Sequence, residues 1–280
     1  MSQPLPKLGI LAGGGTLPAR IAAAVRGQGR DVFVVAFDGH TDPATVEGLP
    51  HLWSRFGAAG GIIDRLKKEK VTELVFAGPV RRPSFTELLP DWYTTKFLAK
   101  VGTRALGDDG LLRSVARELE GEGFRVVGLH ELLGELLTPV GPVGRLRPDG
   151  EAERDIARAV EVASALGALD VGQGAVVQQG LVLAVEAIEG TDAMLARCVG
   201  LARPGPGGIL VKVKKPQQDR RLDLPTMGVT TVENAARAGL RGIAVEAGGS
   251  LLVDRAAVAE TADRLGLFVV GITVASEPRP

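Results

Sequence analysis

Cysteine is almost missing from this sequence: Cys198 is the single one among 280 residues. One thiol cannot form a disulfide within the chain, so the fold needs no oxidising compartment. Free cysteine behaves as a small apolar side chain and is among the residues most often buried. We therefore expect Cys198 to lie in a core rather than to carry chemistry.

The sequence also lacks an excess of charge of either sign. Its 33 lysine and arginine residues balance 33 aspartate and glutamate residues, which leaves no chain-wide basic field to attract a nucleic acid. Nucleic acid is therefore not an expected partner. Uncharged apolar runs stay short of the roughly 20 residues that span a bilayer, and residues 1–15 lack the regions of a signal peptide. We expect a protein that does not cross a membrane.

Several catalytic motifs are absent too. The sequence has no H-E-x-x-H, no C-x-x-C, no G-x-S-x-G and no G-x-x-x-x-G-K-[ST], and its three histidines are far apart. Zinc chemistry, serine hydrolysis and Walker-type hydrolysis therefore lose support. Carboxylates and cations remain, and these suit phosphate chemistry with Mg²⁺, in which a carboxylate can act as the general base.

Short apolar runs and helix-period segments alternate in the first half of the chain. Such alternation is typical of α/β domains with a parallel sheet, whose ligands sit beyond the carboxyl ends of the strands. We expect a Rossmann-like domain over residues 1–137. The expected strands are Leu8–Ala12, Asp31–Phe37, Val71–Ala77 and Phe124–Val127, and the expected helices include Ala19–Arg26 and Ile62–Lys70.

A segment rich in proline and glycine, residues 138–150, fits neither a helix nor a central strand and is interpreted as an interdomain linker. Residues 151–280 are then expected to form a second α/β domain, which begins with a helix at Glu151–Leu166. A further helix is expected from about Thr191. The expected strands are Ala175–Gln179, Leu181–Ala187, Ile209–Val213, Gly242–Val245 and Phe268–Ile272.

The loop LAGGGTLP after the first strand is the first chemical signal. The N–H groups of Gly13 to Gly15 can approach phosphate oxygens, and a helix that starts near Leu17 points its positive end at them. A tight strand-to-helix turn without a ligand is the alternative. Asp38 stands where a dinucleotide enzyme places its ribose carboxylate, but Pro18 replaces the last glycine of G-x-G-x-x-G, so NAD binding is a weakened alternative.

Two further loops of the first half carry charged side chains. In FAGPVRRP, Gly78 precedes Arg81 and Arg82, which suit bidentate contact with phosphate or carboxylate but also occur as a solvated pair. In GDDGLL, Asp108 and Asp109 come before an amphipathic helix. One of them suits the helix N-cap, which leaves the other for a ligand or a metal.

The second half gathers more charge. The sequence VEAIEGTDAMLAR opens a helix at Gly190, Thr191 and Asp192, which brings helix N–H groups and carboxylates together, although capping alone also explains it. In LVKVKKPQQDRRLDLPTMGVTT, five cations surround Asp219 and Asp223, an arrangement that is unusual for a solvated loop. The cations are Lys212, Lys214, Lys215, Arg220 and Arg221.

Together these motifs resemble the LpxI-type UDP-2,3-diacylglucosamine pyrophosphatases of lipid A biosynthesis. The resembling segments are, in this order, LGILAGGGTLP, FAGPVRRP, GDDGLL, VEAIEGTDAML and KPQQDRRLDLPTMGVTTVE. The resemblance as a whole extends over essentially the whole chain, from about Lys7 to Val274. The last two motifs are specific, whereas the glycine loop alone is not.

The resemblance implies a reaction and a fold. Such enzymes hydrolyse the pyrophosphate of UDP-2,3-diacylglucosamine to UMP and 2,3-diacylglucosamine 1-phosphate and need Mg²⁺. They bind the substrate in a cleft between a Rossmann-like amino-terminal domain and a family-specific carboxyl-terminal α/β domain. The lipid-linked UDP-sugar implies a cytoplasmic enzyme, peripheral to the inner membrane of a Gram-negative bacterium, and a homodimer is compatible with that role.

The resemblance also assigns residues. The family's essential aspartate, in its D-x-P-x-x-G segment, corresponds to Asp223, which is expected to hold the metal or to activate water for attack on the lipid-side phosphorus. Lys214, Arg220 and Arg221 are expected to neutralise charge on the departing UMP, and Asp192 is the second expected metal ligand. The expected substrate-binding residues are Gly13, Gly14, Gly15, Thr16, Leu17, Gly78, Arg81, Asp109, Gly190, Thr191, Asp192, Thr226 and Gly228.

Aromatic residues are scarce, with 8 Phe, 2 Trp and 1 Tyr, so acyl chains are expected to lie mainly on aliphatic side chains. Trp92, Tyr93 and Phe97 are candidates for an apolar patch at a membrane surface, although packing of a helix into the core is the favoured interpretation.

Two other functions stay open. A nicotinamide-dependent oxidoreductase would use the glycine loop and Asp38, and a non-catalytic UDP-sugar or lipid-binding protein would use the acidic cluster for structure alone. Substitution of Asp223 by alanine distinguishes the second of these from a hydrolase, because only the hydrolase loses turnover.

Overall fold

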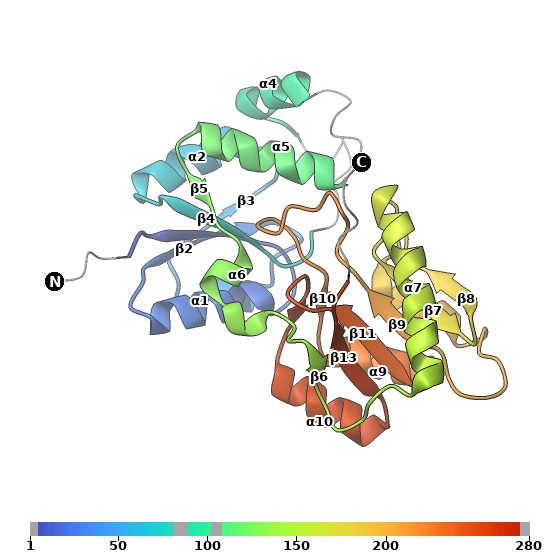
Figure 1. Ribbon diagram of the computed structural model, residues 1–280. Helices are drawn as coiled ribbons and strands as arrows, with labels where there is room; N and C mark the ends of the chain where they lie inside the picture. Colours follow the sequence, from blue (N-terminus) through green and yellow to red (C-terminus); the bar gives the residue numbers. More distant parts are fainter. Residues whose placement is uncertain (1–4, 81–88, 102–107, 275–280) are drawn as a thin grey trace. The chain divides into compact units, whose positions relative to one another are not determined.

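The computed structural model describes residues 5–80, 89–101 and 108–274 and divides into two compact units (Figure 1). Unit 1 consists of Met1–Gly134 and the short segment Asp219–Asp223. Unit 2 consists of Glu135–Gln218 and Leu224–Pro280. The chain therefore leaves unit 2 after Gln218, contributes one short segment to unit 1, and returns to unit 2 at Leu224.

Unit 1 contains an all-parallel sheet of five strands. The strands are β1 (Leu8–Ala12), β2 (Val32–Phe37), β3 (His51–Ser54), β4 (Glu73–Ala77) and β5 (Arg125–Val126). They lie in the order β3-β2-β1-β4-β5, and Ile10 of β1 pairs with Val34 on one side and Val75 on the other. Parallel strands covered on both faces need continuous apolar runs, and β1 and β2 are buried at every residue.

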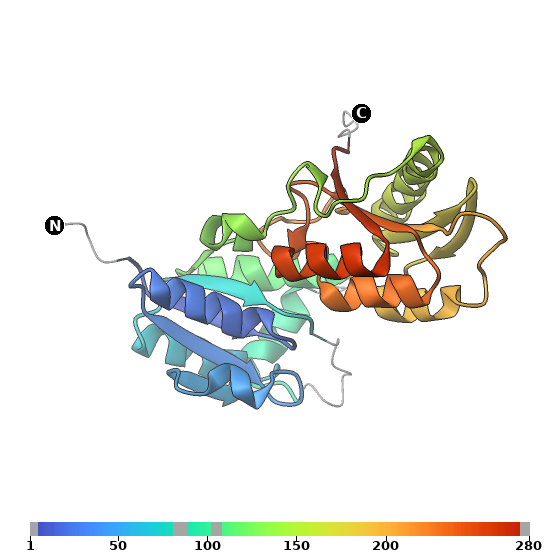
Figure 2. The same ribbon diagram turned by 90° about the horizontal axis from the view of Figure 1, so that it is seen from below.

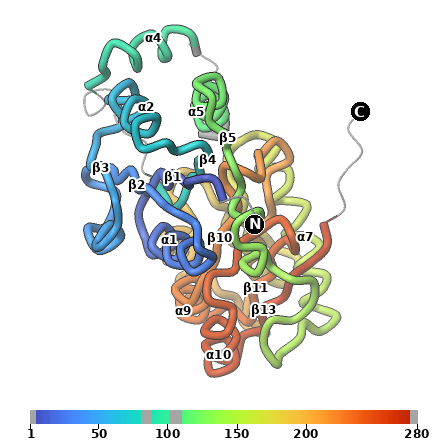
Figure 3. The backbone as a smooth tube through the Cα atoms, turned by 90° about the vertical axis from the view of Figure 1, so that its left-hand side faces the viewer, coloured from blue at the N-terminus to red at the C-terminus, as the bar shows by residue number. Residues whose placement is uncertain are grey.

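Helices cover both faces of this sheet (Figure 3). They are α1 (Leu17–Gly27), α2 (Ala59–Lys68), α5 (Asp108–Gly121) and α6 (Leu129–Leu132), and α4 (Trp92–Val101) packs on α2. A 3₁₀ turn, η1 (Pro43–Val46), also belongs to unit 1, and a second, η3 (Gly134–Leu136), crosses the boundary between the units in the sequence. On one face, Leu66 of α2 and Leu119 of α5 share a core with Phe33 of β2. On the other face, α1 buries Ile21 and Val25.

Unit 2 contains a mixed six-stranded sheet. Its strands are β6 (Gly141–Pro142), β7 (Gly174–Gln178), β8 (Leu181–Val185), β9 (Ile209–Lys212), β11 (Gly242–Glu246) and β13 (Phe268–Ile272). They lie in the order β6-β13-β11-β9-β7-β8, in which β9, β11 and β13 are parallel and β7 is antiparallel to both of its neighbours. A separate parallel pair joins β10 (Thr226–Met227) to β12 (Leu251–Leu252).

The sheet of unit 2 also lies between helices. The helices are α7 (Gly150–Ala168), α8 (Gly190–Cys198), α9 (Val229–Arg237) and α10 (Arg255–Leu265). Ile156 of α7 packs on Ile209 and Val211 of β9, whereas Leu195 of α8 and Val232 of α9 belong to the core on the opposite face. Figure 2 shows α9 in orange and α10 in red side by side over that opposite face.

Cys198 ends α8 within this opposite core and is 1% exposed, which confirms the expectation from the sequence. Burial raises the pKa of its thiol. The side chain therefore contributes packing to the core of unit 2.

Residues 138–150, expected to be a linker, form part of unit 2, and the boundary between the units comes earlier, after Gly134. Gly141–Pro142 forms the edge strand β6, antiparallel to β13. Proline is tolerated at the edge of a sheet because no second neighbour needs its missing N–H. The Ser250 hydroxyl donates a hydrogen bond of 2.8 Å to Thr138 Oγ1, which ties the start of this segment to the rest of unit 2.

The expected fold class, two α/β domains of which the first is Rossmann-like, is confirmed. Each strand expected from the apolar runs is present, with ends shifted by a few residues at most. Strands β3, β6, β10 and β12 and helices α6, α9 and α10 were not expected from the sequence. The ligand cleft expected between the domains stays a prediction.

Candidate functional site

One edge of the sheet in unit 2 gathers charged side chains. Strands β8, β9 and β11 all end at this edge, because β7 is antiparallel to β8 and β9, and β9 runs parallel to β11. Glu186 follows β8, Lys212 is the last residue of β9, and Glu246 is the last residue of β11. Ligands of open α/β sheets bind at such carboxyl edges, so this edge is the candidate site of unit 2.

Lys212 places a buried ammonium group at this edge. Its side chain is 5% exposed, and Nζ donates to Thr191 Oγ1 at 2.8 Å and to the Thr226 carbonyl at 3.4 Å. The Thr191 hydroxyl in turn donates to Glu186 Oε1 at 2.7 Å. The three side chains therefore form a chain of hydrogen bonds that runs from the ammonium to the carboxylate.

Gly174 makes room for the carboxylate of Glu186. Gly174 pairs with Lys212 across β7 and β9, and a Cβ atom at residue 174 would lie only 2.7 Å from Glu186 Oε2. The Glu186 N–H also donates to the Gly174 carbonyl at 2.9 Å. Glu186 is 6% exposed, and among the described residues its Oε2 has no hydrogen-bond partner. The absence of a side chain at Gly174 thus allows a buried carboxylate beside Lys212.

Two helices begin at the same edge. Helix α8 starts at Gly190, and α9 follows Gly228, so each presents backbone N–H groups and the positive end of its dipole. Asp192 Oδ1 in the first turn of α8 accepts a hydrogen bond of 2.7 Å from Asn234 Nδ2 of α9. The structure therefore brings together five of the predicted substrate-binding residues, namely Gly190, Thr191, Asp192, Thr226 and Gly228.

Lys214, a predicted catalytic cation, lies just beyond β9. Its backbone N–H donates to Glu246 Oε2 at 2.7 Å, which ties the chain after β9 to the end of β11. The next residue, Lys215, forms an ion pair of 2.7 Å with Asp170. Lys214 thus shares the carboxyl edge with Lys212, whereas the charge of Lys215 is compensated by a carboxylate.

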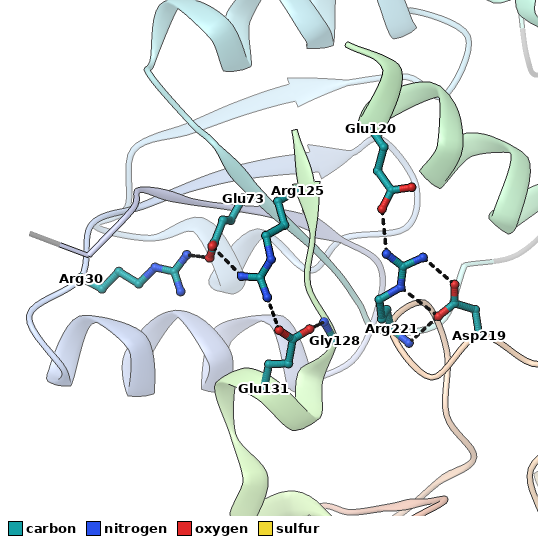
Figure 4. A network of polar contacts seen from close by, with 8 residues as sticks. All are labelled: Arg30, Glu73, Glu120, Arg125, Gly128, Glu131, Asp219 and Arg221. Carbon is teal, nitrogen blue, oxygen red and sulfur yellow. Dashed lines mark hydrogen bonds and ion pairs between the residues drawn. The ribbon is translucent and has the colours of Figure 1, made fainter. Parts of the chain in front are cut away.

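The predicted aspartate, Asp223, belongs to a segment that is anchored in unit 1 (Figure 4). Leu222 is 7% exposed and packs in the core beneath α2 and α5. The Arg221 guanidinium pairs with Glu120 of α5 at 2.7 Å and with Asp219 at 2.8 Å. An apolar side chain and a pair of ionic contacts therefore hold the backbone next to Asp223.

These contacts compensate the charge of Arg221. Hydrogen bonds from Arg221 lower the pKa of Asp219, and hydrogen bonds to Asp219 and Glu120 raise the pKa of Arg221. The geometry therefore gives Arg221 the role of holding the segment, and its predicted contact with UMP stays a prediction. Arg220 and Asp223 are both exposed.

A second group of ion pairs supports the loop on which this segment rests (Figure 4). Arg125 pairs with Glu73 at 2.7 Å and also with Glu131, and Glu131 Oε1 accepts a hydrogen bond of 2.9 Å from the Gly128 N–H. A Cβ atom at residue 128 would lie 3.1 Å from the Cα of Arg221. The loop after β5 and the backbone at Arg221 are therefore in close contact.

The glycine loop of unit 1 packs against a neighbouring loop. The Gly13 N–H donates to the Ala77 carbonyl at 2.7 Å, and the Gly14 N–H donates to the Pro79 carbonyl at 2.8 Å. A Cβ atom at residue 13 would lie 2.5 Å from the carbonyl oxygens of Gly78 and Pro79, so the close approach of the loops requires glycine there. Both N–H groups are thus hydrogen-bonded to backbone carbonyls, and the contact of Gly13 and Gly14 with a phosphate stays a prediction.

Other predicted residues of unit 1 are only partly described. Residues 15–17 lead into α1, where Thr16 is the N-cap but its side chain accepts no capping hydrogen bond. Helix α5 begins at Asp108, so Asp109 lies in its first turn, and the side chains of both lie outside the described residues. Arg81 also lies outside the described residues.

The carboxylates that the structure describes can be tested against the ligands that Mg²⁺ needs. Among those residues, no group of three His, Cys, Asp or Glu side chains gathers. Asp192 and Asp223 are both exposed. Mg²⁺ is usually bound by one or two carboxylates together with water and substrate phosphates. The donor chemistry of either aspartate therefore fits Mg²⁺ that binds with a phosphorylated ligand.

The aromatic side chains of α4 differ in their surroundings. Trp92 is 74% exposed, with Lys96 Nζ 4.9 Å from the ring centroid, so core packing was the wrong interpretation for this residue. Tyr93 packs against the core of α2 and α5, which confirms core packing for this residue. Its hydroxyl is hydrogen-bonded to Glu118 at 3.0 Å and to Glu122 at 2.9 Å. Among the described residues, no helix is long and apolar enough to cross a membrane.

Sequence reasoning missed three charged members of the edge in unit 2, namely Lys212, Glu186 and Glu246, and did not mention the last of them at all. It named Lys212 and Glu186 only as parts of charged stretches and assigned neither to a site. A signal was present, because Lys212 ends the apolar strand Ile209–Lys212, all of whose residues are buried. A lysine in such a run has to be compensated by a partner or a ligand.

The fold and the charged edge define a class of protein: a Rossmann-like α/β unit joined to a mixed α/β unit whose strand ends suit a phosphorylated ligand. The LpxI N-terminal domain family matches residues 7–136, and the LpxI C-terminal domain family matches residues 139–270. The chain belongs to the LpxI family. A relative from Caulobacter vibrioides, named UDP-2,3-diacylglucosamine pyrophosphatase LpxI, is 46% identical over 279 residues, which cover 97% of this chain and 99% of the relative.

One solved structure also shows a likeness. The biotin carboxylase domain of a single-chain bacterial carboxylase is 19% identical, and the match covers 61% of this chain and 35% of the other with a TM-score of 0.22. A TM-score of 0.22 is too low to indicate a shared fold.

Proposed function

We propose that this protein hydrolyses the pyrophosphate bond of UDP-2,3-diacylglucosamine to give UMP and 2,3-diacylglucosamine 1-phosphate in lipid A biosynthesis. The observation that carries the proposal is the 46% identity to the Caulobacter vibrioides pyrophosphatase, which spans nearly all of both chains. The carboxyl edge of unit 2 supports it, because Lys214 and the N-termini of α8 and α9 lie there, and cations and helix N-termini are suited to bind phosphate oxygens.

Asp223 is the residue that we propose for the chemical step. It follows the buried Leu222 and the ion-paired Arg221, so its backbone is held while its carboxylate stays accessible. In this step the carboxylate accepts a proton from water as the water oxygen bonds to the lipid-side phosphorus. The bond from that phosphorus to the bridging oxygen breaks, and UMP leaves with the bridging oxygen.

We propose Mg²⁺ as the cofactor, with Asp192 and Asp223 as its candidate protein ligands; if Asp223 held the ion, it would do so in place of accepting the proton. When bound, the ion would neutralise charge on the pyrophosphate oxygens and lower the pKa of a bound water. Lys214 and Arg220 are proposed to neutralise charge on the departing UMP. Arg221 is proposed to act on the position of Asp223, since Asp219 and Glu120 already occupy its guanidinium.

Hydrolysis of UDP-2,3-diacylglucosamine by the purified protein tests this proposal. We expect release of UMP with Mg²⁺, loss of that release with EDTA, and a decrease of roughly a thousandfold or more in Asp223→Ala. In ¹⁸O-labelled water, the label is expected in 2,3-diacylglucosamine 1-phosphate. Asp31→Ala is the control, because Asp31 is an exposed aspartate at the amino end of β2 and should retain wild-type turnover.

Each part of the proposal has an outcome that overturns it. Label in UMP would contradict attack on the lipid-side phosphorus, and full activity in EDTA would contradict the role of Mg²⁺. Wild-type protein that binds the substrate without cleaving it would contradict catalysis and favour the binding protein.

We also propose that the protein meets its substrate at the surface of the inner membrane as a peripheral protein. Trp92 is the candidate contact, because it is 74% exposed and Lys96 lies beside its ring. Sedimentation with vesicles of phosphatidylethanolamine and phosphatidylglycerol should recover the wild type and less of Trp92→Ala. Trp53→Ala, which changes the other, 36% exposed tryptophan, should sediment as the wild type does, and equal sedimentation of all three would contradict the assignment.

A further inference from the structure

Lys212 carries a buried charge to which the proposed reaction gives no role so far. Its side chain is 5% exposed, and its ammonium donates to one hydroxyl and one carbonyl oxygen. A lysine ammonium has three donors and a full positive charge, and burial of such a charge without a counter-charge is costly. Among the described residues Lys212 takes part in no direct ion pair, whereas Lys215 pairs with Asp170 at 2.7 Å.

The nearest compensation comes through a neutral group. The Thr191 hydroxyl lies between Lys212 and Glu186, accepting from Nζ at 2.8 Å and donating to Oε1 at 2.7 Å. A direct ion pair would satisfy both charges, but the intervening hydroxyl leaves each charge only partly compensated. Consistent with this, Glu186 Oε2 is buried without a hydrogen-bond partner in the described part of the chain.

The position of the ammonium suits a ligand from solution. Thr226, whose carbonyl accepts one of the hydrogen bonds, is exposed, and Thr191, whose hydroxyl accepts the other, is half-buried, so the ammonium is hydrogen-bonded to two residues that are in contact with solvent. Helix α8 begins one residue before Thr191. A phosphate oxygen is the ligand that a buried ammonium and a helix N-terminus both attract.

We propose that Lys212 binds a phosphate group of the substrate and that Thr191 and Glu186 are positioning residues that hold its ammonium at the edge. The identity of the substrate rests on the proposed function, but the phosphate-binding role does not. In this arrangement the negative charge of the phosphate compensates the ammonium of Lys212, which has no direct ionic partner among the described residues. Binding of the phosphate therefore stabilises the folded protein.

Binding of inorganic pyrophosphate to the full chain, in EDTA, tests the inference without catalysis. We expect the affinity of Lys212→Met to fall by about tenfold or more, because a charge-assisted contact is lost. Lys215→Met is the matched control, three residues further along, and should bind as the wild type does. Lys212→Met leaves the Glu186 carboxylate buried without its nearby ammonium, so its melting temperature should fall, and binding is measured below that temperature, where the variant is folded.

Kinetics separate positioning from folding. We expect kcat/KM for UDP-2,3-diacylglucosamine to fall by about a hundredfold in Lys212→Met and by a smaller factor in Thr191→Val, which keeps the volume but removes the hydroxyl. Thr191→Ser restores the hydroxyl and should restore the rate. A Lys212→Met variant with a lowered melting temperature but wild-type pyrophosphate affinity and kinetics would overturn the inference, because it would give Lys212 a structural role.

The two proposals fail in different ways. Wild-type protein that hydrolyses nothing but binds pyrophosphate in a Lys212-dependent manner would contradict the proposed function and support the phosphate site. Normal hydrolysis by Lys212→Met would leave the proposed function intact and overturn the inference.

Discussion

Three cations between Lys212 and Arg221 have different surroundings although they are close in sequence. Lys212 donates to a hydroxyl and a carbonyl, Lys215 pairs with Asp170, and Arg221 is shared by Asp219 and Glu120. Only the first of these three has no direct ionic partner among the described residues. Charge in a sequence therefore becomes binding capacity only where the fold does not already compensate it.

The contact between Asp219 and Arg221 predicts a pH dependence of stability. Arg221 holds the folded pKa of Asp219 below the ordinary value, which is about 3.9 for aspartate. The stabilisation is therefore complete above the ordinary pKa and is lost as the pH falls through the lower, folded pKa. We expect the urea midpoint of the wild type to decrease as the pH is lowered below about 4. The urea midpoint of Asp219→Asn should decrease less steeply over the same pH range.

The control for this experiment is Asp64→Asn, which changes an exposed aspartate of α2 and should preserve the wild-type pH profile. Parallel profiles for the wild type and Asp219→Asn would show that the ion pair does not contribute to acid stability.

Cys198 gives a second prediction for a single residue. Its thiol is 1% exposed and burial raises its pKa, so the reactive thiolate is scarce in the native protein. Alkylation by iodoacetamide at mildly alkaline pH should be slow in the native protein and fast in denaturing urea, as measured by intact mass. Rapid labelling of the native protein would show that the core of unit 2 opens readily around α8.

The sequence predicted the helix start at Gly190 to Asp192 because that signal is local. It did not predict the contact of Thr191 with Lys212 and Glu186, since this contact depends on the pairing of β7 with β8 and β9. The contact of Arg221 with Glu120 could not be found either, because Glu120 lies about a hundred residues earlier in the chain. The sequence therefore predicted which charged residues are present, but not which of their charges are compensated by a partner in the fold.

Among the elements, the segment Asp219–Asp223 has a direct consequence for activity. Leu222→Ala should lower the free energy of unfolding by about 3 kcal/mol, because a buried leucine is truncated in a core. It should also lower kcat, because Asp223 then loses its adjacent anchor. Urea unfolding and steady-state hydrolysis measure the two effects.

Leu66→Ala is the matched control for this element. Leu66 is fully buried in the same core, so its truncation should cost similar stability while the backbone next to Asp223 stays anchored. An equal loss of kcat in both variants would mean that the activity follows the stability of unit 1 and not the position of the segment.

Elements with continuous apolar runs, such as β1, β2 and β9, were predictable because burial on both faces leaves a strong pattern. Strand β3 was not, because its residues alternate between exposed and half-buried and the strand lies at the edge of the sheet. Proline in β6 argued against a strand, and the β-branched start of α9, VTTV, argued against a helix. In each case tertiary contacts outweighed local preference.

At the scale of the whole molecule, unit 1 is built from two separate stretches of chain. A fragment with residues 1–134 lacks Leu222 and Arg221, so part of its core and the partner of Glu120 are missing. We expect this fragment to melt at a lower temperature than the same fragment mixed with a synthetic peptide that contains Asp219–Asp223. Calorimetry with a control peptide that carries Leu222→Ala and Arg221→Gln measures the difference, and equal melting temperatures would contradict the anchoring.

This division of unit 1 also limits how such proteins can recombine. A crossover near residue 135 would join the first half of one parent to a second half whose segment Asp219–Asp223 had adapted to another surface. The residues at positions 222 and 221 would then pack in the core of the other parent and face its helix α5, so their contacts with the core and with Glu120 would no longer be matched. In a functional chimera, this segment has to come from the same parent as the first half. Recombination therefore cannot exchange the two halves independently, although each has its own sheet.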